Sequence, residues 1–401
     1  MPPATALTTP SRALVPALSL TLLISWGSLY YSFAIWVRPM QDELPWSGTA
    51  AMGAYSTALV VWGLCAYPAG RLMDRHGGRL PMVLGSCGCA LLFAALSQVH
   101  TLWAFYLVWA GLGACMALVL YEPAFAVIVA AWPHDYRRRI GMLTLTGGLA
   151  STVFWPLTHG LVAVLGWRHT LLVYAATHFL VCVPLHWFLV PRLGPGARAG
   201  LSLGPPKVAP PAPRSALASP VFWMLALAFA AFGFVTSAMA MYVVPMLEAT
   251  GLTPAAAIAV AALIGPMQVA GRSADLLLAN RLQPRTVGMV TVALIPVALL
   301  VLWVAPGALP AVYFFAVIYG AGLGLLTIVR AAAPVAIFGA AGYASISGAL
   351  SGSSVLARAA GPMAGALVMA HHGYTTLVLV LMVFAAGGAC AYWGAVLRRS
   401  P

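Results

Sequence analysis

The chain has 401 residues, of which 62% are hydrophobic and only 7% are charged, and its formal net charge is +13 at pH 7. A soluble globular domain carries roughly 25% charged residues, so this composition excludes an ordinary soluble protein and indicates a polytopic membrane protein. The basic residues are spread singly over short polar segments, a pattern typical of cytoplasmic loops that argues against nucleic-acid binding.

Twelve apolar stretches have the length of about twenty residues that a membrane-spanning helix needs. The first six are expected near 13–37, 48–70, 80–99, 102–131, 141–165 and 170–190. The last six are expected near 219–246, 254–279, 286–305, 309–338, 344–370 and 374–397. The predicted fold class is therefore an all-α membrane protein with twelve transmembrane helices.

A polar break separates the two groups of six helices. Residues 191–218 are rich in Pro and Gly and contain several basic residues, so we expect a cytoplasmic linker without fixed structure. The predicted bundles are then 13–190 and 219–397, flanked by short tails at 1–12 and 398–401. Twelve spans place both termini on the same side, and the distribution of basic residues over the loops places that side in the cytoplasm.

Residues 70–79, Gly-Arg-Leu-Met-Asp-Arg-His-Gly-Gly-Arg, form a charged turn between the second and third stretches. Five positions carry a specific pattern of glycines, one acid and two bases: Gly70, Asp74, Arg75, Gly77 and Arg79. They match the loop between the second and third helices of the major facilitator superfamily, and the chain resembles these secondary transporters. The resemblance implies two six-helix bundles, transport by alternating access, no enzymatic activity, and a conformational role for this loop without substrate contact.

An internal repeat agrees with that resemblance. Residues 70–74 end the second stretch, and the related residues 271–275 end the eighth, about half a chain later. The Gly-Leu-Gly sequence at 111–113 likewise recurs at 322–324. Two halves related in this way are typical of secondary transporters.

Ionisable residues inside membrane spans are costly unless they face a cavity or a partner, so they indicate functional sites. Four are candidates: Glu122, Arg272, Arg330 and Arg358. With a rise of roughly 1.5 Å per residue, Arg358 is expected about 20 Å into a core about 30 Å thick. No acidic residue lies within two turns of it, so its expected partner is a substrate anion, with backbone carbonyls or Glu122 as alternatives.

Glu122 and Arg330 occupy similar positions in the fourth and tenth spans, which the resemblance places on the cavity side. We expect Glu122 to act in proton coupling or gating, and Arg330 to contact substrate or to form a gate with Glu122. A carboxyl group that is alternately buried and paired has its pKa raised and then lowered, as a proton carrier requires. The alternatives are a structural salt bridge and an arginine that extends to the membrane surface.

The eighth span resembles the monocarboxylate porter branch of the superfamily, in which an acid and an arginine lie four residues apart. Here Gln268 stands in place of the acid, so the resemblance implies a carboxylate-binding role for Arg272 and leaves the proton role unfilled at this position. The alternative is that Arg272 merely repeats Arg71 of the first loop motif, which needs no ligand.

Aromatic residues supply the remaining candidate contacts. The first span resembles the same branch around Tyr30 and Tyr31, although Ala34 lies near the place of the lysine found in the animal porters. Together with Gln268, Tyr242 and Tyr319 complete the predicted substrate-binding set. Packing or a place in the interfacial aromatic belt is the alternative for each of these tyrosines.

The remaining polar residues indicate no other chemistry. His159, His178 and His186 lie in the fifth and sixth spans, where a hydrogen-bonded structural role is favoured over proton transfer. The six cysteines lie in apolar runs without metal-ligand spacing, so neither a metal nor a cofactor is expected. A membrane-embedded enzyme or sensor is disfavoured because the chain shows no nucleophile–base pair and no phosphate-binding loop.

The sequence thus predicts a secondary transporter, working as a monomer in a bacterial inner membrane, that carries a small monocarboxylate-like anion with a proton. The alternative within transport is proton-driven efflux of amphipathic or cationic compounds.

Overall fold

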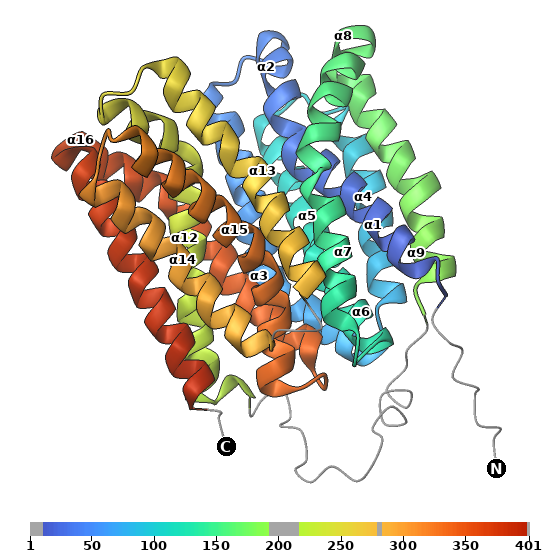
Figure 1. Cartoon of the computed structure of the whole chain (residues 1–401). Coiled ribbons are helices and arrows are strands. Elements are labelled where there is room, and N and C mark those ends of the chain that lie inside the picture. The colour runs from blue at the N-terminus through green and yellow to red at the C-terminus, as the bar shows by residue number, and fades with distance from the viewer. Residues whose placement is uncertain (1–10, 192–215, 279–282, 399–401) are drawn as a thin grey trace, which may run out of the picture. The chain divides into compact units, whose positions relative to one another are not determined.

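The computed structural model describes residues 11–191, 216–278 and 283–398, and these contain helices but no strand. The chain divides into two compact units. The first comprises Met1–Pro211 with Ala340–Ser345, and the second comprises the remainder. Figure 1 shows the long helices of each unit side by side, coloured blue to green in the first and yellow to red in the second.

Helices of the first unit cover residues 14 to 189. They are α1 (Leu14–Trp26), the π-helical turn η1 (Gly27–Tyr31), α2 (Phe33–Glu43), α3 (Gly48–His76), α4 (Arg79–Leu96), α5 (Leu102–Val119), α6 (Tyr121–Ala131), α7 (Tyr136–Gly148), α8 (Ala150–Thr177), a second π-helical turn η2 (His178–Cys182) and α9 (Val183–Leu189). Thus α1, η1 and α2 form one continuous path, as do α8, η2 and α9.

The second unit has fewer but longer helices. They are α12 (Pro220–Ala249), α13 (Pro254–Leu278), α14 (Pro284–Val304), α15 (Leu309–Phe338) and α16 (Tyr343–Leu397), of which the first residues of α16 group with the first unit. Each of α12, α14 and α15 has a proline in its first turn, where the missing N–H removes no helical hydrogen bond.

Two glycines divide helices α8 and α16. Gly166 in α8 and Gly373 in α16 have φ values of 76° and 75°, a region that glycine enters without steric cost. Divided at these glycines, with α5 and α6 counted together and α7 counted with the first part of α8, the described residues form the twelve stretches that the hydropathy pattern predicts. By length and composition, nine undivided helical segments in the described part of the chain can cross a membrane.

Some predicted boundaries are wrong. The stretch 102–131 is interrupted at Leu120, whose extended backbone (φ −85°, ψ −153°) separates α5 from α6. Pro123 lies in the first turn of α6, where the helix tolerates it. The first span continues to Glu43, six residues beyond its predicted end. Most of the predicted linker, residues 192–215, lies outside the described residues.

The repeated glycines make the same kind of contact in both units. A Cβ atom on Gly113 of α5 would meet the backbone of Ala58 in α3. A Cβ atom on Gly324 of α15 would meet the backbone of Gln268 in α13. Small residues therefore allow helix backbones to approach closely, as in other membrane helix pairs.

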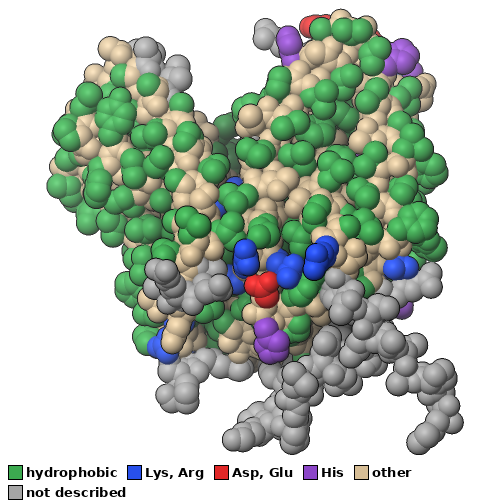
Figure 2. All heavy atoms as spheres, turned by 45° about the vertical axis from the view of Figure 1, so that its right-hand side comes forward, with side chains coloured by type: hydrophobic (Ala, Val, Ile, Leu, Met, Phe, Trp, Pro, Cys, Tyr) green, Lys and Arg blue, Asp and Glu red, His purple; other side chains and the backbone are tan. Residues whose placement is uncertain are grey.

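Apolar side chains cover much of the exterior. For example, Trp103 of α5 is 71% exposed and Leu277 of α13 is 81% exposed. Figure 2 shows hydrophobic side chains over most of the visible face, with most of its Lys and Arg side chains in the lower part. A surface of this kind is soluble in lipid rather than in water.

Candidate functional site

The loop motif at the end of α3 is anchored by its acid. Oδ2 of Asp74 accepts hydrogen bonds from the backbone N–H of Ser345, at 2.7 Å, and from its hydroxyl, at 2.5 Å. Ser345 lies in the first turn of α16, whose positive dipole end favours a carboxylate. Asp74 therefore connects α3 with a helix start 271 residues later in the chain.

The other motif residues shape this connection. A side chain on Gly70 would meet the carbonyl group of Ala344, so only glycine lets α3 approach the start of α16. Gly77 ends α3 with a φ of 78°. Nε of Arg79 donates to the carbonyl oxygen of Val190 at 2.6 Å, whereas Arg75 is exposed. The motif thus connects α3 with the start of α16, and the start of α4 with the end of α9.

An aromatic cluster occupies the first unit. We use this term for Trp26, Tyr30, Tyr31, Trp62 and Tyr121, which come from α1, η1, α3 and α6. The ring centroid of Trp26 lies 5.2 Å from that of Tyr30, 6.3 Å from Tyr31, 5.8 Å from Trp62 and 5.0 Å from Tyr121. These separations are typical of favourable aromatic pairs.

The π-helical turn η1 brings both tyrosines to the same tryptophan. Ser32 donates its N–H to the carbonyl oxygen of Gly27 at 2.9 Å, the five-residue hydrogen bond that defines this turn. The wider turn lets Trp26 contact Tyr30 and Tyr31, four and five residues later. The sequence predicted both tyrosines but neither the π turn nor the tryptophans.

A buried hydrogen bond connects the two π-helical turns. Oγ of Ser28, in η1, lies 2.9 Å from Nε2 of His178, the first residue of η2. Since the Ser28 hydroxyl also donates to the carbonyl oxygen of Ile24 at 2.8 Å, His178 is the donor through Nε2. His186 similarly contacts Ser86 at 2.9 Å. These contacts fit the structural role expected for the two histidines.

Glu122 directly follows Tyr121 of the aromatic cluster in the chain. It occupies the first turn of α6, directly after Tyr121, and is half-buried with its Oε2 atom fully buried. A carboxylate in the first turn of a helix interacts favourably with the helix dipole. Glu122 and the first-span tyrosines thus belong to the same unit.

The three predicted arginines lie on three helices of the second unit. Arg272 of α13 is buried, with 7% of its surface exposed. Arg330 of α15 is half-buried, with its guanidinium carbon 5.8 Å from the ring centroid of Phe229. Arg358 of α16 is half-buried, and its Nε atom is buried without a hydrogen-bond partner among the described residues. A buried guanidinium N–H of this kind requires an acceptor.

Asp275 is a buried ionisable residue that the sequence indicated only as part of the repeated motif. It follows Arg272 by three residues on α13 and is 4% exposed. Its place in the repeated motif, three residues after the arginine, was the available signal. Gln268, one turn before Arg272, is half-buried, and its backbone lies directly against Gly324 of α15.

The two tyrosines predicted in the second unit have different surroundings. Tyr242 of α12 donates its hydroxyl to the carbonyl oxygen of Pro362 at 2.9 Å and packs against Gly365 of α16. Tyr319 of α15 is buried against Phe315, with ring centroids 5.5 Å apart. Tyr242 therefore already has a structural hydrogen bond.

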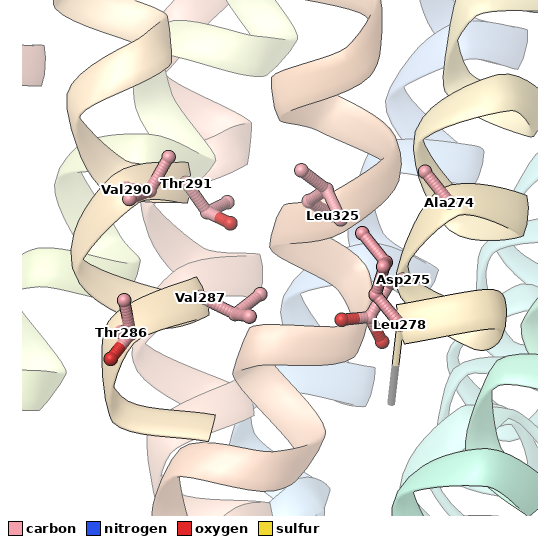
Figure 3. A pocket seen from close by; sticks show the side chains of 8 residues that line it. All are labelled: Ala274, Asp275, Leu278, Thr286, Val287, Val290, Thr291 and Leu325. Atoms are coloured by element: carbon pink, nitrogen blue, oxygen red, sulfur yellow. The ribbon is translucent and has the colours of Figure 1, made fainter. Parts of the chain in front are cut away.

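A small cavity of about 150 Å³ lies within the second unit. Its walls come from α13, α14 and α15 and include Asp275, Thr286, Thr291 and Leu325. Figure 3 shows Leu325 between the α13 and α14 residues, with the Asp275 side chain directed toward the cavity. The lining is mostly apolar and includes none of the predicted substrate-binding residues. Within the described chain, no three His, Cys, Asp or Glu side chains form a possible metal site.

Outside the membrane spans, Glu43 joins two loops of the first unit. Its Oε1 accepts from Nε of Arg168 at 2.9 Å, and its Oε2 accepts from Nε1 of Trp167 at 2.7 Å. Arg168 also donates to the carbonyl oxygen of Ser97 at 2.6 Å. The hydrogen bond from Arg168 lowers the pKa of Glu43 from its ordinary value.

The family follows from comparison with known proteins. The model of the Major Facilitator Superfamily matches residues 17–362, which is most of the chain. The protein therefore belongs to the major facilitator superfamily, as the loop motif indicates. It is a multi-pass membrane transporter and not an enzyme.

Two curated relatives resemble part of the chain. A probable L-galactonate transporter of Escherichia coli is 24% identical over 155 residues, which are 38% of this chain and 33% of the relative. The multidrug resistance protein MdtG of Dickeya zeae is 27% identical over 161 residues, which are 40% of this chain and 38% of the relative. The matches thus span about a third of each relative.

Solved structures with the same fold match almost the whole chain. A variant of the E. coli fucose:proton symporter FucP has a TM-score of 0.71 at 15% identity, covering 97% of this chain and 100% of that one. The human organic anion transporter MFSD10 (TETRAN) has a TM-score of 0.65 at 16% identity, covering 94% and 96%. These likenesses establish the all-α fold.

Proposed function

We propose that the protein carries a small monocarboxylate-like organic anion across the bacterial inner membrane by alternating access, together with a proton. The observation that carries the proposal is the buried Nε atom of Arg358, which has no hydrogen-bond partner among the described residues. A carboxylate offers the planar acceptor pair that a guanidinium group binds best.

The charge balance of the second unit supports an anion. Its membrane helices contain Arg272, Arg330 and Arg358, while its acidic residues are Glu248 and Asp275. A positively charged set of this kind favours an anionic substrate. The names of two similar proteins, a probable L-galactonate transporter and an organic anion transporter, point in the same direction.

Glu122 is the proposed proton carrier. It is a half-buried carboxyl group on a membrane helix, and ionisable groups at such positions commonly serve proton pathways. The fold neighbour FucP is named as a proton symporter. We place both termini in the cytoplasm, because the basic residues then lie mainly on the cytoplasmic side, and we propose that one chain is the functional unit.

Efflux of amphipathic or cationic compounds is the second candidate. It is favoured because the first unit contains both Glu122, which directly follows Tyr121 in the chain, and the aromatic cluster, and carboxylates and aromatic faces both attract cations. One partial relative is named as a multidrug resistance protein. This candidate requires that Glu122, and no arginine, be essential for binding.

Uptake into proteoliposomes tests the proposal. Labelled lactate and a larger carboxylate, such as phenylacetate, are supplied with and without an inward proton gradient. We expect gradient-stimulated uptake that is lost in Glu122→Gln and in Arg358→Ala. Stimulated uptake that survives in Arg358→Ala, or no uptake of any carboxylate by folded protein, contradicts the proposal. Export of a cationic dye that depends on Glu122 alone supports the second candidate.

A further inference from the structure

We propose that the aromatic cluster of the first unit binds an aromatic ring of the substrate, and that its indole N–H groups select a ring bearing an acceptor oxygen. The substrate class is then an aryl carboxylate with an ether or hydroxyl oxygen on its ring. This inference rests on the proposed function for the anionic nature of the substrate, and it concerns the first unit alone.

The cluster brings five aromatic rings together in one unit. Trp26 is its centre, with four rings at centroid separations of 5.0 to 6.3 Å. Tyr31 extends it to Trp155, whose ring centroid is 6.2 Å away. Aromatic rings bind best to other rings at such separations, in edge-to-face or offset geometry.

Two donors in the cluster require an acceptor. Trp26 is 7% exposed and Trp62 is 3% exposed, and the Nε1 atom of each is buried without a hydrogen-bond partner among the described residues. The indole N–H group only donates, and buried tryptophans usually find a partner for it. Two neighbouring unpaired donors therefore point to a ligand with an acceptor oxygen.

The first span contains a π-helical turn at this cluster. The π turn η1 departs from regular helix geometry, and such turns frequently occur at functional sites. Its effect is to bring Tyr30 and Tyr31 to one side of Trp26. Packing alone does not require two adjacent tyrosines on the same tryptophan, since a regular helix separates neighbouring side chains around its axis.

The donors also distinguish the ligand from a cation. Aromatic faces attract cations, but an unpaired N–H directs a positive hydrogen toward the ligand. An aryl carboxylate with a ring oxygen satisfies the rings and the N–H groups together. A quaternary ammonium compound satisfies the rings alone.

Calorimetric binding to the full-length protein in detergent tests the inference. The probes are lactate, 4-methylphenylacetate, 4-methoxyphenylacetate and phenyltrimethylammonium. We expect both aryl acids to bind at least about 10-fold more tightly than lactate. The methoxy compound should exceed the methyl compound by about 2- to 10-fold, the range for one neutral hydrogen bond.

Phenylalanine substitutions separate the two features. Trp26→Phe and Trp62→Phe keep a ring but remove the N–H, so at least one of them should abolish the methoxy preference and retain the preference for aryl acids over lactate. Trp103→Phe, at an exposed position outside the cluster, is the matched control and should leave both preferences unchanged. Size exclusion and thermal melting confirm that each variant is folded.

The outcomes distinguish this inference from the proposed function. Lactate bound as tightly as the aryl acids overturns the inference and leaves the proposed function standing. A methoxy preference retained in both Phe variants also overturns it. Tighter binding of phenyltrimethylammonium than of any carboxylate, or no carboxylate binding by folded protein, overturns the proposed function and the inference together.

Discussion

The two units repeat one packing scheme. In the first, Gly113 lets α5 approach the backbone of α3, and in the second, Gly324 lets α15 approach the backbone of α13. The segments 70–74 and 271–275 likewise end the second helical stretch of each half with the same spacing of Gly, Arg and Asp. Positions where two helix backbones meet tolerate only small residues, so the two halves have the same glycines there.

The side chains away from these contacts have diverged. The first unit holds a cluster of five aromatic residues and Glu122, whereas the second holds Arg272, Arg330 and Arg358. Both described π-helical turns belong to the first unit. A repeated backbone therefore carries two different sets of side chains, aromatic rings in the first unit and arginines in the second.

The largest expected effect comes from removing the positive charge that sets the second unit apart. Arg358→Ala should weaken carboxylate binding about 30-fold or more, because loss of one partner from a buried charged hydrogen bond costs at least about 2 kcal/mol. Arg358→Lys should also weaken binding, since lysine lacks the planar pair of donors. Equilibrium binding of labelled phenylacetate measures both.

Arg285→Ala is the matched control for charge, because Arg285 is an exposed arginine of the same unit. Its affinity should stay within about 2-fold of the wild type, the scale of a surface charge effect. Equal losses in the Arg358 and Arg285 variants would show that net charge, and not a specific contact, attracts the substrate.

The loop motif offers the next largest effect. Asp74→Ala removes two hydrogen bonds to Ser345 at the start of α16 and should slow uptake about 10-fold, while equilibrium binding changes little. Asp135→Ala is the control, since it breaks the partly exposed pair with Arg139. A loss of affinity in Asp74→Ala that matches the loss of rate would contradict a purely conformational role.

The connection between the π turns predicts a smaller change. Ser28→Ala leaves the Nε2–H of His178 without its acceptor in a buried site and should destabilise the protein by about 1–3 kcal/mol. Ser28→Thr keeps the hydroxyl and should retain most of the stability. Ser56→Ala is the matched control, because Ser56 donates to the carbonyl oxygen four residues earlier, as Ser28 does, but is exposed.

Thermal melting in detergent measures the difference in stability between Ser28→Ala and Ser56→Ala. If Ser28→Ala and Ser56→Ala lower the melting temperature equally, the contact with His178 contributes nothing, and the tyrosines of η1 are positioned by other means. A weaker preference for aryl acids in Ser28→Ala would connect the π turn to the aromatic cluster.

The smallest effect concerns the loop pair of the first unit. Arg168 lowers the pKa of Glu43, so the ionised carboxylate stabilises the folded state above its unfolded pKa of about 4.3. That contribution is lost as the pH falls through the lower folded pKa. Glu43→Gln should therefore lower the melting temperature slightly at pH 7, and the difference should vanish toward pH 3. A difference that grows on acidification would contradict this assignment.

Several features were predictable because they depend on local sequence. Twenty-residue apolar stretches define the spans, and the fixed spacing of Gly70, Asp74 and Gly77 identifies the family. The glycines at 166 and 373 lie in the predicted breaks between spans. The break at Leu120 was missed because the residues around it are as apolar as the helices that it separates.

The class, most of the membrane spans and the identity of the charged residues inside them thus follow from the amino-acid sequence alone, because each depends on a local pattern. Which side chains meet is settled only in the folded chain. Ser28 reaches His178 across 150 residues, and Asp74 reaches Ser345 across 271. No local pattern specifies such pairs, since they depend on how distant helices pack and on a π turn that changes which residues share a face.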